Sequence, residues 1–136
     1  MTIALDTINL FVQNMKKTLF FYGLLGFTFS EDDYEKSYVK LNTSSVSLCF
    51  YSQDTVNEFF NSELIHSNSS HQFELSFRVD KPEEVDTIYN KMIEQGYNSF
   101  RKPENSTWNQ RVAFLKDPDN NLIEINALLN GLEKDE

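Results

Sequence analysis

Two glutamates are the residues of this chain best placed to do chemistry. Glu124 lies between Ile123 and Ile125 in an otherwise apolar run, and Glu74 opens the alternating segment ELSFRV. Successive side chains of a strand point to opposite faces, so each carboxylate would lie opposite its apolar neighbours. Close carboxylates raise each other's proton affinity. The pair could act as a general acid or base, hold a hard cation weakly, contact an organic ligand, or form the wet side of a sheet.

The other reactive residue types offer less. Cys49 is the only cysteine and lies in the apolar run VSLCFY, which favours a buried, inert thiol over a nucleophile. His66 falls in a polar connector, and His71 comes three residues before Glu74, so strand alternation turns it to the other face. We expect surface or structural roles for both histidines.

Composition indicates a globular protein that does not bind polyanions. The chain has 136 residues, 40% of them hydrophobic, with a formal net charge of −9. That charge argues against nucleic acid and anionic membrane surfaces as partners. The first residues lack a basic leader with an apolar core, and no apolar run could cross a bilayer, so we expect a cytoplasmic protein. The 12 Phe and 6 Tyr residues suit a core or a small-molecule pocket.

The first half predicts a strand, a helix and three further strands. Asn14 is the expected N-cap of the helix MKKTLFFYGLLGF, which should end at Gly26. The predicted strands are Ile3 to Val12, Phe27 to Ser30, Tyr34 to Asn42 and Ser45 to Tyr51.

The second half repeats this order. A strand begins at His71, and Asp80 is the expected cap of a helix that has Pro82 in its first turn and ends at Gly96. The remaining predicted strands are Asn98 to Arg101, Arg111 to Lys116 and Asn121 to Leu128.

The repeat predicts an α+β fold of two βαβββ modules in one domain, residues 1–136. Module one covers about residues 1–52, a connector about 53–70, and module two about 71–130. In each module a helix would cover one face of a mixed sheet, and the uncovered faces would curl together around a cleft. Polar residues that alternate with the core would face that cleft: Thr7, Asn9, Glu74, Ser76 and Arg78.

Three segments resemble the vicinal oxygen chelate superfamily, which includes glyoxalase I, bleomycin-resistance and fosfomycin-resistance proteins and extradiol dioxygenases. They are INLFVQNMKKTLFFYGLLGF, ELSFRVDKPEEVDTIYNKMIEQGY and WNQRVAFLKDPDNNLIEI. Asn109 and Asn120 replace two glycines of the closing motif. Asparagine tolerates left-handed backbone angles, so we expect the hairpin to survive.

The resemblance implies four metal-ligand positions on the cleft-facing strands. Here these positions hold Thr7, Leu48, Glu74 and Glu124. A catalytic divalent site normally needs three good protein ligands. We therefore expect no metal cofactor, with weak divalent binding by the glutamates as the alternative.

The sequence therefore predicts a small-molecule-binding protein, comparable to the bleomycin-resistance members that sequester a drug. The ligand would be an organic molecule, cationic or aromatic. One alternative is a divergent lyase, isomerase or dioxygenase that uses Glu74 and Glu124; another is a non-catalytic dimeric interaction module. The resemblance also implies a homodimer. Arg111 could orient the ligand or pair with one of the two glutamates, and Trp108 could be a wall, a lid or a core residue. The candidate ligand-binding residues are Thr7, Asn9, Phe11, Leu48, Phe50, Glu74, Trp108, Arg111 and Glu124.

Overall fold

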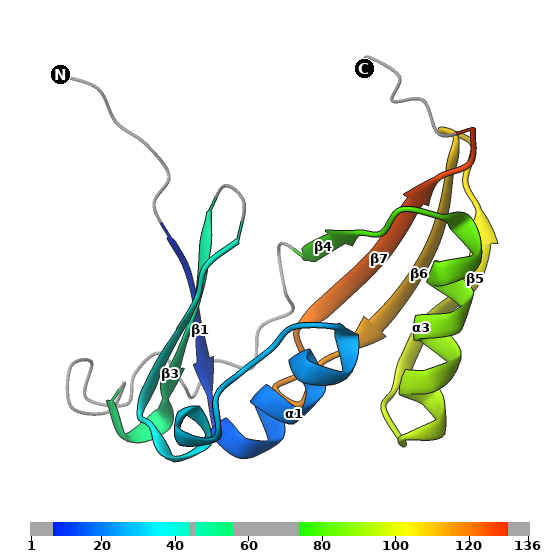
Figure 1. Ribbon diagram of the computed structural model, residues 1–136. Helices are drawn as coiled ribbons and strands as arrows, with labels where there is room; N and C mark the ends of the chain where they lie inside the picture. The colour runs from blue at the N-terminus through cyan, green and yellow to red at the C-terminus, as the bar shows by residue number, and fades with distance from the viewer. Residues whose placement is uncertain (1–6, 44–45, 56–73, 131–136) are drawn as a thin grey trace, which may run out of the picture. The chain divides into compact units, whose positions relative to one another are not determined.

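The computed structural model describes residues 7–43, 46–55 and 74–130. The chain divides into two compact units, residues 1–69 and 70–136, and each described part contains one mixed sheet and one main helix (Figure 1). This α+β architecture agrees with two βαβββ modules. The predictions for His66 and His71 lie outside the described residues. Within those ranges no helix is long and apolar enough to span a membrane.

The first unit is a three-stranded sheet with one helix. Its elements are β1 (Thr7–Val12), α1 (Met15–Leu25), the 3-10 helix η1 (Glu31–Glu35), β2 (Tyr38–Leu41) and β3 (Ser47–Ser52). The strand order is β1-β3-β2, with β1 parallel and β2 antiparallel to β3. As predicted, Asn14 caps α1: its Oδ1 accepts a hydrogen bond from the Lys17 N–H at 3.0 Å. Gly26 ends the helix with φ +130°.

The predicted strand Phe27 to Ser30 does not form. The chain instead enters η1, and the Asp33 carboxylate accepts a hydrogen bond from the Ser30 N–H at 3.0 Å. Such local bonds from acidic side chains compete with the hydrogen-bond ladder of a sheet. The next predicted strand, Tyr34 to Asn42, shortens to β2 for the same reason.

The second unit has four strands and a longer helix. Its elements are β4 (Leu75–Arg78), α3 (Pro82–Glu94), β5 (Ser99–Asn105), β6 (Gln110–Lys116) and β7 (Leu122–Leu128). The strand order is β4-β7-β6-β5; β4 runs parallel to β7 and the other pairs are antiparallel. Helix α3 covers one face of this sheet (Figure 1). Its buried Val85, Tyr89 and Met92 pack against the apolar side chains of β6 and β7.

The ends of α3 correct one prediction and confirm another. The N-cap is Lys81 rather than Asp80, and the Glu84 carboxylate accepts a hydrogen bond from the Lys81 N–H at 2.9 Å. Pro82 follows at the first helical position, where a missing N–H costs nothing. At the other end Gly96 has φ +94°, and the Tyr97 N–H donates to the Met92 carbonyl at 3.2 Å.

Both asparagines that replace motif glycines adopt left-handed backbone angles. Asn109 has φ 67° and Asn120 has φ 68°, and among the described residues they are the only non-glycine positions with positive φ. In the β6–β7 turn, the buried Asp117 accepts hydrogen bonds from the N–H groups of Asp119 at 2.9 Å and Asn121 at 2.8 Å. The prediction that asparagine preserves the hairpin is confirmed.

Candidate functional site

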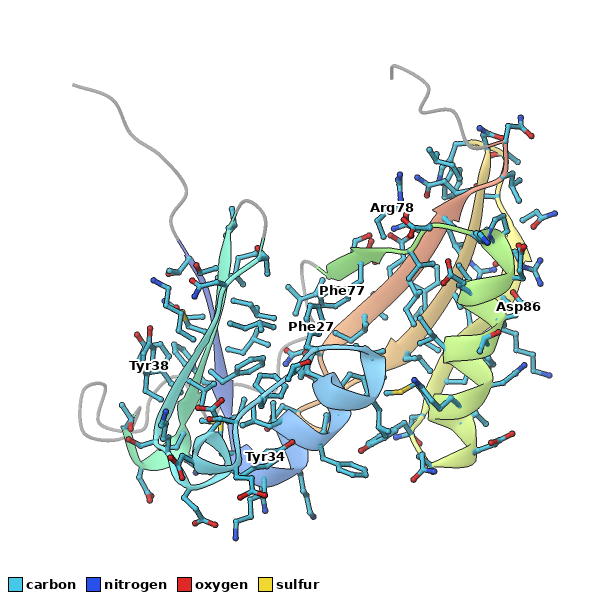
Figure 2. The ribbon with its side chains drawn as sticks, viewed as in Figure 1. Phe27, Tyr34, Tyr38, Phe77, Arg78 and Asp86 are labelled. Atoms are coloured by element: carbon cyan, nitrogen blue, oxygen red, sulfur yellow. The ribbon has the colours of Figure 1, made fainter. Side chains whose placement is uncertain are left out.

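The second sheet carries a group of polar side chains on the face away from α3. Cross-strand register pairs Ser76 with Glu124 and Arg78 with Asn126. The alternate residues Leu75, Ile123 and Ile125 are buried on the α3 side. Figure 2 shows Arg78 on the side of the sheet away from α3, which carries Asp86. We call Ser76, Arg78, Glu124 and Asn126 the polar ladder.

Glu124 is held by two donors on one of its oxygens. Its Oε1 accepts hydrogen bonds from the Ser76 hydroxyl and from the Asn126 Nδ2 at 3.1 Å. Glu124 is only 9% exposed. Neither bond involves the second carboxylate oxygen, Oε2. Glu124 is therefore a largely buried carboxylate with one oxygen fixed by two donors.

Asn126 connects Glu124 to Arg78. Its Nδ2 donates to the Ser76 Oγ at 2.7 Å as well as to Glu124, and its Oδ1 accepts a hydrogen bond from the Arg78 Nε. Each end of the amide thus has one type of partner, which sets its orientation. A continuous network of this kind positions all four side chains together.

Glu74 lies one residue before β4 and is exposed. Partial burial raises the pKa of its carboxyl group, and the negative charge of Glu124 raises that pKa further. Desolvation is the larger of these two causes of the raised Glu74 pKa.

In the first unit, three predicted site residues share one face. Thr7, Asn9 and Phe11 pair in register with Ser47, Cys49 and Tyr51 of β3. The ring of Phe11 meets that of Tyr51 edge-on, with centroids 6.3 Å apart. On the same face, Cys49 is buried as expected, and its Sγ lies 3.5 Å from the Tyr38 hydroxyl.

Leu48 and Phe50 lie on the opposite face, so their predicted placement beside Thr7 is wrong. Both are buried, and the fully buried Phe50 ring packs against Tyr22 of α1 with centroids 5.1 Å apart. Register pairs Leu48 with Ile8 and Phe50 with Leu10, which are also on the helix side.

The residues at the four implied ligand positions do not fit a divalent metal. Leu48 is in the core, Thr7 offers one hydroxyl, and Oε1 of Glu124 already accepts two hydrogen bonds. Nowhere in the described ranges do three His, Cys, Asp or Glu side chains come together as a group able to hold a metal ion.

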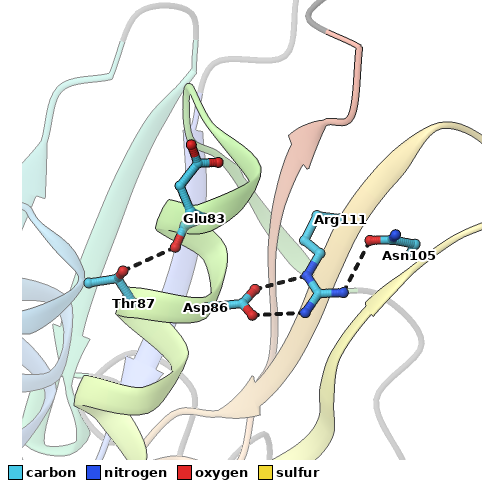
Figure 3. A network of polar contacts seen from close by, with 5 residues as sticks. All are labelled: Glu83, Asp86, Thr87, Asn105 and Arg111. Atoms are coloured by element: carbon cyan, nitrogen blue, oxygen red, sulfur yellow. Dashed lines mark hydrogen bonds and ion pairs between the residues drawn. The ribbon is translucent and has the colours of Figure 1, made fainter.

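Arg111 is not brought together with Glu74 or Glu124. Its Nε and Nη2 each donate to one oxygen of Asp86 on α3, both at 2.8 Å, and its Nη1 donates to the Asn105 Oδ1 at 3.1 Å (Figure 3). The alternative that Arg111 pairs with one of the two glutamates is also wrong, because Asp86 is the partner. Trp108 is 62% exposed, which excludes a core role. Its Nε1 donates to the Gln110 Oε1 at 3.1 Å.

Asn126 is the site residue that sequence reasoning missed. It lies two positions after Glu124, so strand alternation alone places it on the same face. Ser76 and Arg78 were assigned to this face but not to the site, since their bonds to β7 depend on the register of two strands distant in sequence.

Comparison with known proteins agrees with this architecture. The family model for the Glyoxalase/Bleomycin resistance protein/Dioxygenase superfamily matches residues 4–125. The uncharacterized protein YraH of Bacillus subtilis (strain 168) is 32% identical over 126 residues, which cover 90% of this chain and 96% of YraH.

Solved structures show the same fold. A glyoxalase/bleomycin resistance protein/dioxygenase family enzyme from Burkholderia phytofirmans PsJN has a TM-score of 0.78 and 25% identity, covering 93% of this chain and 100% of that one. The hypothetical protein SA1046 from S. aureus has a TM-score of 0.75 and 23% identity, covering 93% of this chain and 94% of that one. With a family model that spans most of its length, the chain belongs to the glyoxalase/bleomycin resistance protein/dioxygenase superfamily.

Proposed function

We propose that this chain is a small-molecule-binding protein that uses the polar ladder on the second sheet and does not depend on a divalent metal. The observation that carries the proposal is the state of Glu124. One of its oxygens is fixed by Ser76 and Asn126, and the other takes no part in these two bonds. A carboxylate held in one orientation can accept a hydrogen bond from a ligand without first losing side-chain entropy.

This arrangement favours a ligand with an amino group or another strong donor at Glu124. A charged donor forms a stronger bond to a carboxylate than a neutral one does. The net charge of −9 also attracts cations toward the protein. These features support the cationic or aromatic organic ligand expected from the sequence.

The raised pKa of Glu74 favours acid–base catalysis as a second candidate function. A carboxyl group that keeps its proton closer to neutral pH can donate it to a substrate, with Glu124 as the charged partner. Glu74→Gln would then lower the rate of turnover while ligand binding persists. A protein that only binds its ligand would show no turnover in either form.

A ligand screen with matched variants tests the primary proposal. We would screen amines and aromatic cations by thermal shift on metal-stripped protein, and measure the hits by calorimetry in Glu124→Gln. The control is Glu83→Gln, because Glu83 is an exposed carboxylate on α3, away from the polar ladder. We expect binding without metal that weakens about tenfold in Glu124→Gln, the value of one charge-assisted hydrogen bond, and is unchanged in Glu83→Gln.

The same protein would be titrated with Zn, Ni, Mn, Mg and Fe(II). Tight metal binding that disappears in Glu124→Gln would overturn the metal-independent proposal and direct the work to lyase and dioxygenase substrates. Hits that bind equally well to Glu124→Gln would show that the polar ladder is not the binding site.

A further inference from the structure

Within the described ranges, Arg78 differs from the other two arginines of this chain in having no carboxylate partner. Arg111 forms a bidentate pair with Asp86, and Arg101 lies 3.4 Å from Glu104. Among the residues that the structure describes, Arg78 makes no ion pair, and its one hydrogen bond is from Nε to Asn126. The chain has 21 acidic residues against 12 basic ones, so an arginine without an acidic partner in the described ranges is unexpected.

The position of Arg78 is nevertheless defined. Its Nε is bonded to the Asn126 Oδ1, and the Nδ2 of that amide is bonded to both Ser76 and Glu124. This bond orients the plane of the guanidinium group. The two terminal nitrogens, Nη1 and Nη2, have no partner among the described residues, and Arg78 is exposed. They form the donor pair that binds a carboxylate or phosphate group in bidentate geometry.

We propose that Arg78 is a specificity-determining residue that binds an anionic group of the ligand, a carboxylate or a phosphate. This inference rests on the proposed binding function and names the ligand class. Arg78 is paired in register with Asn126, and Glu124 lies two residues earlier on β7. Two residues of a strand span about 6.6 Å. The ligand therefore carries a donor, such as an amino group, at Glu124 and an anionic group at Arg78, and is amphoteric rather than simply cationic.

The charge balance of the site agrees with an amphoteric ligand. A purely cationic ligand at Glu124 would lie near the positive charge of Arg78. A purely anionic ligand at Arg78 would lie near the negative charge of Glu124. A ligand with both charges satisfies both side chains. Since the ladder is only partly buried, we expect binding to weaken as salt is added.

The first experiment follows the Nε–Hε signals of the three arginines by nuclear magnetic resonance during titration with benzoate and, separately, inorganic phosphate. We expect the Arg78 signal, assigned by its loss in Arg78→Lys, to shift saturably with at least one anion. The signals of Arg101 and Arg111 should shift less, because each of these arginines already lies beside a carboxylate, that of Glu104 or Asp86. The preferred anion identifies the chemical class. Equal shifts of all three signals, or no shift of Arg78 with either anion, would overturn the proposal.

The second experiment uses 4-(aminomethyl)benzoate, which carries both charges, with benzoate and benzylamine as probes of each half. We expect Arg78→Lys to weaken binding of benzoate about tenfold because it replaces a bidentate donor with a point charge. The control Arg101→Lys should leave that affinity unchanged. Glu124→Gln should weaken benzylamine and not benzoate. If benzylamine binding depends on Glu124 while benzoate binding is indifferent to Arg78, the binding function stands and this inference fails.

Discussion

Arg111 and Asp86 form a two-point contact that joins β6 to α3, with Nε and Nη2 of the guanidinium each 2.8 Å from one carboxylate oxygen. The side chains are 25% and 40% exposed, so solvent screens the pair only in part. Arg111 also bonds Asn105 on β5, and the contact therefore connects three elements of the second unit (Figure 3). It explains why Arg111 contributes to stability rather than to the polar ladder on the other face.

Loss of this contact should lower stability. We expect Arg111→Gln to reduce the free energy of unfolding by about 1 kcal/mol, the upper range for a partly exposed ion pair with good geometry. Urea unfolding measures the change, with Arg101→Gln as the control. That arginine is 62% exposed and makes a longer contact, so its loss should have little effect. Equal losses in both variants would mean that the geometry of the Asp86 pair adds nothing.

The same pair should make stability depend on acid pH. The hydrogen bond from Arg111 lowers the pKa of Asp86 below its usual 3.8, and this effect exceeds the opposing effect of burial. The folded pKa is depressed, so the stabilisation is present above pH 3.8 and is lost as pH falls through the folded value. We expect Asp86→Asn to flatten the loss of stability in this window. A wild-type slope retained in Asp86→Asn would assign the acid sensitivity to other groups.

Glu74 should have the opposite dependence. Its folded pKa is raised above the usual 4.5, so the folded state binds its proton more tightly than the unfolded chain does. Its contribution to stability is present below pH 4.5 and is lost as pH rises through the folded value. We expect Glu74→Gln to be relatively more stable than wild type near neutral pH. Thermal unfolding at pH 4 and pH 7 measures this difference; a variant that is less stable only at pH 7 would contradict it.

The left-handed angle of Asn120 predicts a graded effect of substitution. In the left-handed region the Cβ of alanine lies too close to the backbone, so Asn120→Ala should lower the free energy of unfolding by about 1 kcal/mol. Asn120→Gly should change it by less, because glycine has no Cβ. Asn98→Ala is the control, because Asn98 has no positive φ. Urea denaturation of the three variants gives the comparison. An alanine as well tolerated at position 120 as at 98 would show that the turn relaxes to another conformation.

The two hydrogen-bond donors around Glu124 predict that an apolar side chain of similar volume at this position will lower stability. Glu124→Gln keeps an oxygen that can accept from Ser76 and Asn126, whereas Glu124→Leu leaves those two donors without this acceptor. We expect the leucine variant to be about 1–2 kcal/mol less stable than the glutamine variant, despite similar volume. Chemical denaturation of both proteins measures the difference. A leucine variant of equal or greater stability would mean that the polar ladder re-forms with water.

Local signals were sufficient for much of the fold. Asn14, Gly26 and Gly96 mark helix ends in the sequence because caps depend on backbone angles within a few residues. Asn109 and Asn120 could be assigned to left-handed angles for the same reason. Ser76 and Glu124 lie on the face predicted for them because polar and apolar residues alternate around them.

The sequence by itself determined the two-module α+β fold, three of the four ends of α1 and α3, and the face on which Glu124 lies, since each depends on a short stretch of chain. The tertiary structure alone decided the rest. In SLCFY the side chains do not alternate in polarity, so only the register with β1 showed that Leu48 and Phe50 face α1. Only the packing of α3 against the sheet brought Asp86 within hydrogen-bond distance of Arg111. Only the pairing of β4 with β7 connected Arg78 to Glu124 through Asn126. These partners are distant in sequence, and no local pattern specifies them.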